Sequence, residues 1–348
     1  MIADRAQTMG AARTVAVLGA AGHTGRFVVS ELLRRGLTPI AVGRDGGRLK
    51  ALEFAGQGVE CREASADNAG ALDRALAGAA AVVNCAGPFL DTADAVASAA
   101  LRAGAHYFDV TAEQASAQLT FDHFDAAARE AAVVVIPAMG FFGGFADLLV
   151  AAAMDDWDAA DDIRIRIAFD SWLPTQGTRM TGARNTAPRC VIAGGRLERA
   201  PQPPARTVWD FPAPFGRQSL VELPFSEVPL IARRLRTTEL HTYLNEIALR
   251  DVGDPLTPTP KPADATGRSA QRFAVEVIVR RSGVGRRILA QGRDIYAFSA
   301  PLVCEAVERV LSGEIQDIGA QSPGAVFDAP DFLRALAPEH LTFEIAAA

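Results

Sequence analysis

The sequence is short of cysteine and histidine: four Cys and five His occur in 348 residues. The cysteines, Cys61, Cys85, Cys190 and Cys304, lie far apart, with no Cys-x-x-Cys pair and no Cys/His cluster at metal-ligand spacing. This pattern predicts neither structural zinc nor a disulfide framework. We therefore expect no metal site, and a reduced, cytoplasmic protein.

Lysine is rarer still, because only Lys50 and Lys261 accompany the arginines. Thirty-five basic and 41 acidic residues give a net charge of −6, and no long block of one sign occurs. A nucleic-acid partner is therefore not expected. The residues four positions after the three tyrosines are Thr111, Ile247 and Ala300, so the Tyr-x-x-x-Lys pair of short-chain dehydrogenases is absent.

Long apolar runs are also missing. The first 13 residues contain no apolar segment of the kind found in signal peptides, and residues 131–154 form the one membrane-like stretch. Pro137, several glycines and Asp147 interrupt that stretch. A buried strand, a loop and a helix are expected there, and no membrane span.

What the sequence does contain is a regular alternation from Thr14 to about Met139. Short β-branched runs such as "TVAVLG", "TPIAVG" and "AVVVIPA" alternate with Ala/Leu-rich stretches of helical spacing, giving six strands. Strands and helices that alternate in this way form right-handed crossovers and a parallel sheet. The pattern predicts an α/β protein with a Rossmann doubly wound domain over residues 13–145.

The pattern changes after Ala153. "DDIRIRIAFD" (161–170) alternates apolar and charged residues, and "RFAVEVIVRRSGVGRRILAQG" (272–292) is typical of a β-hairpin. We therefore expect a second, mixed α/β sheet domain over residues 146–294. Two proline-rich stretches, 200–216 and 253–267, are expected to be surface loops. Helical spacing returns at 296–313.

The stretch "GAAGHTG" places three glycines in the turn between the first predicted strand and the helix that follows it. Gly19 suits a tight turn, Gly22 removes a side chain where a pyrophosphate approaches, and Gly25 lets the helix pack closely. The free amides of a helix N-terminus favour an anion. We expect a dinucleotide here, and the alternative is a turn that needs glycine only for its conformation. The intervening residues are part of the predicted cofactor site: Ala21, His23 and Thr24.

The end of the second strand bears on the choice of cofactor. NAD enzymes usually place Asp or Glu there, whereas this chain has Arg44, whose guanidinium suits a 2′-phosphate. NADP(H) is the predicted cofactor. Asp45 would favour NAD if the turn presented it instead, and Arg44 could also be an ordinary solvated residue.

Two later loops complete the predicted cofactor site. Asp67 follows the third strand and could lie near the adenine or act as the N-cap of the next helix. "NCAGPF" follows the fourth strand, at the sheet edge where the nicotinamide half of the cofactor would run. The residues predicted to bind it are Cys85, Ala86, Gly87, Pro88 and Phe89.

Five segments occur in the order "GAAGHTG", "VGRD", "VVNCAGPF", "AGAHYFDVTAE" and "GRDIYAFSAP". Together they resemble the saccharopine dehydrogenase-like family, which includes saccharopine reductases and trans-acting enoyl reductases. The resemblance covers residues 14–150 and 291–324. It implies an NADP(H)-dependent oxidoreductase with an inserted substrate and dimerisation domain. It also implies that residues 295–348 return to pack on the Rossmann domain, and that the protein is a homodimer.

The end of the fifth strand lies at the ligand-binding edge of the sheet, where we expect the chemistry to take place. Asp109 and Glu113 follow the fifth strand and are the predicted catalytic residues; a hydrogen-bonded strand end and a helix first-turn carboxylate are the structural alternatives. Ala112 stands where the family usually has glycine. The predicted substrate contacts are Thr111, Thr178 and Arg179.

The sequence leaves the substrate open. Arg179 and Arg184 could clamp the carboxylate of an amino-acid imine. Alternatively, "PAMGFFGGF" and Trp172 could line a tunnel for a lipid-like enoyl substrate. The predicted reaction is hydride transfer to a C=N or activated C=C bond. The competing hypothesis is a non-catalytic NADP(H)-sensing regulator, because no proton donor is evident.

Overall fold

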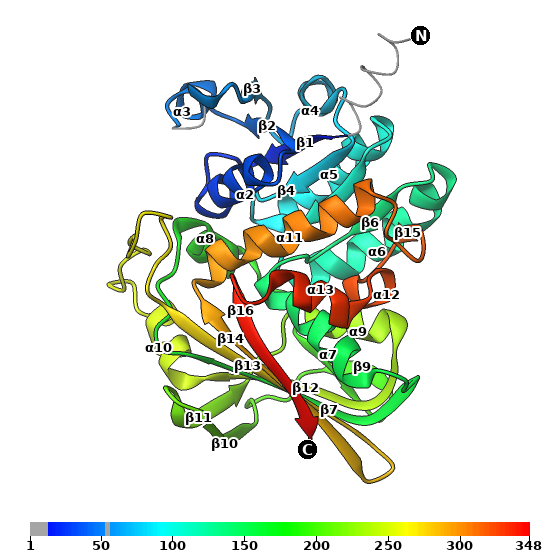
Figure 1. Ribbon diagram of the computed structural model, residues 1–348, viewed down its shortest axis with the longest axis vertical. Coiled ribbons are helices and arrows are strands. Elements are labelled where there is room, and N and C mark those ends of the chain that lie inside the picture. Colours follow the sequence, from blue (N-terminus) through cyan, green and yellow to red (C-terminus); the bar gives the residue numbers. More distant parts are fainter. Residues whose placement is uncertain (1–12, 53–55) are drawn as a thin grey trace. The chain divides into compact units, whose positions relative to one another are not determined.

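The computed structural model describes residues 13–52 and 56–348, and the chain divides into two compact units (Figure 1). Unit 1 contains the described residues up to Gly140 together with 299–321. Unit 2 contains 141–298 and 322–348. The N-terminal segment in which no signal peptide was predicted lies outside the described residues, apart from Arg13.

Unit 1 is built on a seven-stranded sheet whose order is β15-β6-β5-β4-β1-β2-β3. Every pair of neighbouring strands is parallel. The order of its first six strands is that of a Rossmann domain, and this confirms the predicted fold class. The strands are β1 (Thr14–Leu18), β2 (Thr38–Gly43), β3 (Glu60–Glu63), β4 (Ala81–Asn84), β5 (His106–Asp109), β6 (Val134–Ile136) and β15 (Gly319–Ala320).

Five helices follow the first five strands, and the four longer ones each bury an apolar face, whereas α3 buries only Leu49. In α2, for example, Val28 and Leu32 are one helical turn apart and fully buried, whereas Arg26 and Ser30 are exposed. Helix α3 is a short helix that ends at Lys50, and residues 53–55 lie outside the described part. The helices are α2 (His23–Arg34), α3 (Gly46–Lys50), α4 (Ala69–Leu76), α5 (Phe89–Arg102) and α6 (Gln114–Glu130).

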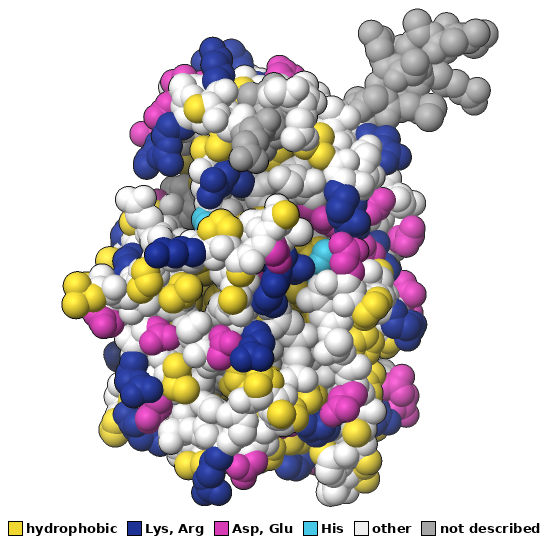
Figure 2. Space-filling view, turned by 60° about the vertical axis from the view of Figure 1, so that its left-hand side comes forward, with side chains coloured by type: hydrophobic (Ala, Val, Ile, Leu, Met, Phe, Trp, Pro, Cys, Tyr) yellow, Lys and Arg dark blue, Asp and Glu magenta, His cyan; other side chains and the backbone are white. Residues whose placement is uncertain are grey.

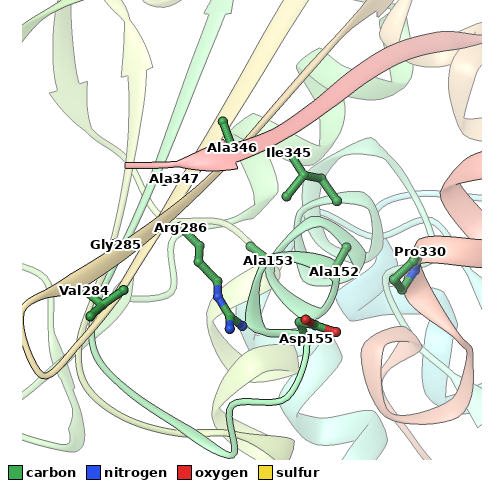
Figure 3. Close-up of a pocket in the computed structure, with 10 residues that line it drawn as sticks. All are labelled: Ala152, Ala153, Asp155, Val284, Gly285, Arg286, Pro330, Ile345, Ala346 and Ala347. Carbon is green, nitrogen blue, oxygen red and sulfur yellow. The ribbon is translucent and has the colours of Figure 1, made fainter.

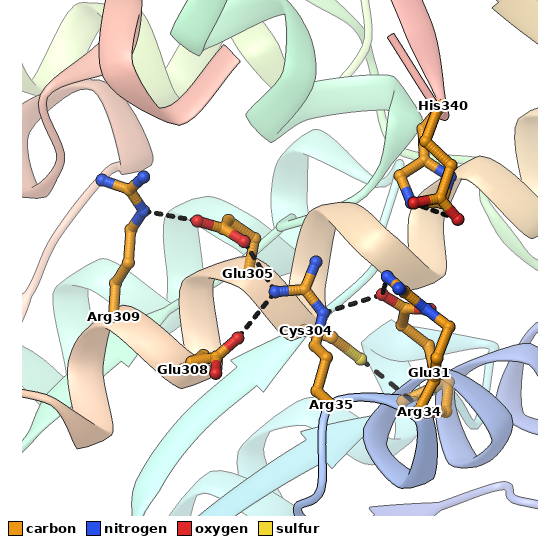
Figure 4. Close-up of polar contacts among 10 residues, drawn as sticks. Glu31, Arg34, Arg35, Cys304, Glu305, Glu308, Arg309 and His340 are labelled. Atoms are coloured by element: carbon orange, nitrogen blue, oxygen red, sulfur yellow. Dashed lines mark hydrogen bonds and ion pairs between the residues drawn. The ribbon is translucent and has the colours of Figure 1, made fainter. Parts of the chain in front are cut away.

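An ion-pair cluster joins α2 to α11 (Ile295–Leu311), whose residues from Ser299 onward belong to unit 1 (Figure 4). The Arg35 guanidinium donates to Glu31 at 2.7 Å, to Glu305 at 2.6 Å and to Glu308 at 2.8 Å. The side chains of Arg35 and Glu31 are each only 9% exposed. The guanidinium thus neutralises carboxylates from two segments far apart in the sequence, and fixes α11 to the Rossmann unit.

We predict that Arg35→Met lowers the free energy of unfolding by about 2 kcal/mol, because Glu31 and Glu305 lose the cation that they share and keep only Arg34 and Arg309. Arg102→Met is the matched control, since Arg102 pairs with Asp73 at an exposed site. Its cost should stay below about 1 kcal/mol. Urea denaturation of the two variants measures the difference, and equal costs would contradict the prediction.

Unit 2 is built on a nine-stranded mixed sheet. The main path runs β10-β11-β12-β7-β13-β14-β16, with β8 pairing β12 and β9 pairing β8. Strands β12 and β7 are parallel, and the other pairs are antiparallel. The strands are β7 (Ala159–Phe169), β8 (Cys190–Ala193), β9 (Arg196–Arg199), β10 (Arg206–Phe211), β11 (Gly216–Glu222), β12 (Arg236–Asn245), β13 (Arg272–Arg281), β14 (Val284–Arg293) and β16 (Leu341–Ala347).

The predicted hairpin is confirmed, with β13 and β14 joined through Ser282 and Gly283. Both turn residues have positive φ, +50° and +80°, as a tight hairpin turn requires. In β7 the isoleucines at 163, 165 and 167 are buried on one face, as the alternation predicts. The helices of unit 2 are η2 (Phe141–Phe145), α7 (Ala146–Met154), α8 (Gln176–Arg184), α9 (Glu227–Arg234), α10 (Glu246–Gly253), α12 (Pro323–Val326) and α13 (Ala329–Leu336).

The apolar stretch 131–154 forms β6, η2 and α7, as expected. Asp147, in the first turn of α7, is fully buried. Its carboxylate accepts from Arg234 Nε at 2.8 Å and from Gly324 N at 2.7 Å. None of the helices in the described part is long and apolar enough to cross a membrane.

Two expectations need correction. Residues 295–348 do not all return to the Rossmann unit, because 322–348 belong to unit 2, where β16 pairs with β14. The proline-rich stretch 200–216 is not entirely a loop, because Arg206–Phe211 forms β10 at the edge of the sheet. Its prolines flank the strand, and an edge strand tolerates such neighbours.

Candidate functional site: a dinucleotide cradle in unit 1

The glycine turn after β1 is closely packed. Gly19 has φ +79°, and a Cβ there would lie 2.9 Å from the carbonyl carbon of Cys85. A Cβ on Gly25 would lie 2.2 Å from Gly19 O, which no packing shift accommodates. Glycine at these positions lets α2 begin directly against the turn.

The first turn of α2 is left without a capping side chain. Its N-cap is Gly22, which makes no side-chain hydrogen bond. By contrast, Asp45 caps α3 by accepting from Arg48 N at 3.0 Å, and Asn68 caps α4 by accepting from Ala71 N at 2.9 Å. Helix N-termini carry unsatisfied amides and a partial positive charge, so the start of α2 suits a phosphate.

The other residues of this turn line the same corner. Gly22 is exposed, and Ala21, His23 and Thr24 are half-buried. The His23 imidazole packs edge-on against the Phe27 ring, with 5.4 Å between ring centroids. The predicted residues of the glycine turn therefore lie together at the start of α2, which has no side-chain cap.

At the end of β2 the structure distinguishes Arg44 from Asp45. The Asp45 side chain is the N-cap of α3, so its carboxylate is committed to the main chain. Arg44 is exposed, and within the described residues no hydrogen bond or ion pair holds its guanidinium. Asp67 is also exposed, and the alternative role as N-cap of α4 is wrong for it, because Asn68 is the cap.

The loop Cys85–Phe89 follows β4 and touches the glycine turn. Cys85 N donates to Leu18 O at 2.8 Å, and Ala86 N donates to Asn84 Oδ1 at 3.0 Å. Desolvation and the nearby Asp109 carboxylate raise the pKa of the Cys85 thiol to about 12, which disfavours the thiolate. Residues 85–88 are half-buried and Phe89 is 8% exposed, so the loop is ordered by packing.

The two carboxylates predicted to be catalytic are buried and bound to main-chain amides. Asp109 is fully buried and accepts from Ala138 N at 2.8 Å and Thr111 N at 3.0 Å. Glu113 is 1% exposed and accepts from Phe89 N at 2.9 Å. Asp109 is thus a hydrogen-bonded strand end, which was its structural alternative. The alternative for Glu113 is wrong, because Glu113 stands at the N-cap position of α6 without capping that helix and binds the start of α5 instead. A direct catalytic role for either carboxylate stays a prediction.

The predicted substrate residues fall in different units. Thr111 is fully buried in unit 1, where its Oγ1 accepts from Glu113 N at 3.0 Å. Thr178 and Arg179 lie on α8 in unit 2, and Arg179 donates to the carbonyl oxygens of Asp254 and Thr257 at 3.1 and 2.8 Å. Their contact with a substrate therefore also stays a prediction.

Sequence reasoning missed Tyr296, which organises the polar residues around α8. Its hydroxyl accepts from Trp172 Nε1 at 2.9 Å and lies 2.8 Å from Thr178 Oγ1. Burial raises the pKa of this phenol, so it stays protonated at neutral pH. The tyrosine was visible in the segment "GRDIYAFSAP", but nothing in the sequence indicated its partners.

Unit 2 also contains a hollow of about 560 Å³ (Figure 3). Small and apolar side chains form most of its wall, with one carboxylate and one guanidinium. That guanidinium, of Arg286, is already bound to Met154 O and to Asp156, each at 2.6 Å. The hollow therefore offers no free set of polar groups comparable to the glycine turn.

Among the described residues we looked for two other kinds of site, a metal centre and a patch of one charge. Within residues 13–52 and 56–348, no three His, Cys, Asp or Glu side chains lie together as metal ligands would. On the face shown in Figure 2, basic and acidic side chains are interspersed.

A parallel sheet in this order, with an uncapped helix at a glycine turn, defines a Rossmann dinucleotide-binding domain. Residues 15–136 match the family model described as the saccharopine dehydrogenase NADP binding domain. The match covers the Rossmann domain of unit 1 and supports the resemblance to the saccharopine dehydrogenase-like family that the sequence showed over this region. A nicotinamide dinucleotide is therefore the expected ligand of the glycine turn.

Two comparisons extend this result. A probable mitochondrial saccharopine dehydrogenase-like oxidoreductase of Arabidopsis thaliana is 29% identical over 140 residues. These make up 36% of this chain and 31% of that protein, so the chain spans about a third of the relative's length. The apo saccharopine dehydrogenase (L-Glu forming) of Saccharomyces cerevisiae matches with a TM-score of 0.66 at 12% identity, covering 96% of this chain and 100% of that one. At this identity the match shows a shared fold.

We predict that Gly25→Ala abolishes cofactor binding, because the added methyl group would displace the turn from the start of α2. Gly70→Ala is the control: it lies on α4, where a Cβ meets no atom closer than 3.6 Å. Titration with NADPH, followed by nicotinamide fluorescence, should show at least about a tenfold loss for Gly25→Ala alone. Unchanged binding by that variant would contradict the role given to the turn.

The free energy of unfolding should depend on pH through the titration of Asp109. Burial raises its pKa from 3.8 to about 6, against the opposing effect of its hydrogen bonds. The folded state therefore holds this proton more tightly than the unfolded state. The associated stability is present below about pH 3.8 and is lost as the pH rises to about 6.

We predict that Asp109→Asn, whose amide oxygen can still accept from the two main-chain amides, removes this dependence. As the pH rises from about 3.8 to about 6, the wild type should lose stability relative to the variant. The difference between their unfolding free energies should change by on the order of 3 kcal/mol. Denaturant unfolding at several pH values measures it. A difference that is constant with pH would contradict the assignment.

Proposed function

We propose that this protein is an NADP(H)-dependent oxidoreductase that transfers a hydride to a C=N or activated C=C bond. The observation that carries the proposal is the uncapped start of α2 at the Gly19–Gly25 turn. A diphosphate accepting from these amides would occupy the groups that no side chain caps.

Arg44 supports the phosphorylated nucleotide. Its guanidinium is exposed at the end of β2, where the adenosine ribose of a bound dinucleotide lies in this fold. Asp45, the residue that would instead favour NAD, is held as the cap of α3. A 2′-phosphate would therefore meet the Arg44 guanidinium.

When bound, the cofactor supplies the hydride, and this chain's own residues orient it. The loop Cys85–Phe89 would pass the nicotinamide ribose, and Asp67 would lie on the adenine side. Asp109, Thr111 and Glu113 fix the ends of the neighbouring strands through main-chain contacts. Their part in catalysis is then to hold the loops that shape the site.

The substrate is proposed to have an apolar part. Phe142 stacks on Phe225 with 4.1 Å between ring centroids and lies 5.4 Å from the Trp172 ring, and Phe225 and Trp172 are buried, so these rings pack on one another. Arg179, a candidate for holding a substrate carboxylate, already donates to two main-chain carbonyls. The engagement of Arg179 favours a lipid-like substrate over a small amino-acid imine.

Three further parts of the proposal rest on the family resemblance and on composition. Residues 146–294 would form the substrate and dimerisation domain, and the protein would act as a homodimer. All four cysteines are free thiols, in keeping with a reducing compartment such as the cytoplasm.

The cofactor preference is tested with Arg44→Ala. We expect wild type to bind NADPH more tightly than NADH, and the variant to lose about tenfold or more in NADPH affinity while NADH binding stays the same. Arg74→Ala, an exposed arginine on α4, is the control and should bind both as wild type does. Equal NADPH affinity in wild type and Arg44→Ala would overturn the assignment to NADP(H).

Catalysis is tested separately by following NADPH consumption with a panel of cyclic imines and enoyl thioesters. Turnover of any of these substrates supports the oxidoreductase. Tight NADPH binding without turnover of any of them would instead favour the NADP(H)-sensing regulator, for which the buried, main-chain-bound state of Asp109 and Glu113 is the structural argument.

A further inference from the structure

Glu113 makes an unusual long-range helix cap. Its two carboxylate oxygens accept from Phe89 N at 2.9 Å and from Leu90 N at 3.0 Å. These are the first two amides of α5, whose own N-cap, Pro88, has no side-chain oxygen. A residue that follows β5 thus binds the loop that follows β4.

Glu113 is itself held in place by a short relay. Thr111 Oγ1 accepts from Glu113 N at 3.0 Å, and Asp109 Oδ1 accepts from Thr111 N at 3.0 Å. Asp109 also accepts from Ala138 N at 2.8 Å, beyond the end of β6. Because Asp109, Thr111 and Glu113 are all at most 1% exposed, water does not compete for these bonds.

A second set of contacts holds the same loop from the side of α5. Thr92 Oγ1 donates to Ala86 O at 2.7 Å and accepts from Asn84 Nδ2 at 3.2 Å. Asn84 Oδ1 accepts from Ala86 N at 3.0 Å. The loop 85–89 is therefore fixed at both ends before any ligand arrives.

The cap also has an electrostatic consequence. The Glu113 carboxylate satisfies the start of α5, whereas the start of α2 has no side-chain cap. A phosphate would therefore be repelled at α5 and attracted at α2. The same carboxylate that shapes the nicotinamide loop would also direct the diphosphate to the glycine turn.

We propose that Glu113 is a positioning residue, which holds the loop Cys85–Phe89 in the form that receives the nicotinamide half of the cofactor. The inference rests on the proposed NADP(H) function and deepens it. It replaces the direct catalytic role that the sequence suggested for Glu113. The adenosine half, bound by the glycine turn and Arg44, should not depend on this contact.

The test compares two probes on the full-length protein: NADP⁺, which has both halves, and 2′,5′-ADP, which has only the adenosine half. Glu113→Gln keeps one acceptor oxygen but loses the second and the charge. We expect it to bind NADP⁺ about tenfold more weakly, and to bind 2′,5′-ADP within twofold of wild type. Glu130→Gln, the same change at an exposed position on α6, is the matched control.

A second variant keeps the test valid if Glu113→Gln folds poorly. Thr92→Val preserves the shape of the side chain but removes its bond to Ala86 O, and it should show the same selective loss. Equal weakening of both probes, or unchanged NADP⁺ binding, in the folded variants would overturn the positioning role. If wild type binds neither probe, the proposed function itself fails, which is a distinguishable result.

Discussion

The close approach of α2 to the turn after β1 is the constraint on which the cofactor site depends. The space between Gly25 and Gly19 O holds no side chain, since a Cβ would lie at 2.2 Å. This contact aligns the first amides of α2 with the carboxyl edge of the sheet. Gly19 also lies against Cys85, so the glycine turn and the nicotinamide loop form one surface.

Around this corner, side-chain caps satisfy three helix starts, whereas the start of α2 at the glycine turn has none. Asp45, Asn68 and Glu113 satisfy the starts of α3, α4 and α5. Gly22 is exposed and makes no side-chain cap, so the start of α2 is open to a ligand. The partial positive charge of this helix start favours an anion without a lysine.

Much of unit 1 could be predicted because its signals are local. Strand and helix periods, the glycine spacing and the position of Arg44 are all properties of short segments. The roles of Asp109 and Glu113 could not be predicted in the same way, because their partners Ala138 and Phe89 lie on other segments and meet them only in the folded sheet. The pairing of β16 with β14 is likewise a long-range contact. It could not be predicted, because the seven residues of β16 show little alternation of apolar and polar residues.

Amide hydrogen exchange with and without NADPH tests the central claim most directly. If the cofactor's phosphates accept from the start of α2, exchange should slow at residues 19–26 and along the loop 85–90, while the Asn68-capped start of α4 should exchange as before. Unchanged exchange rates at residues 19–26, or an equal slowing of exchange in all helices of unit 1, would contradict a dinucleotide bound at the glycine turn.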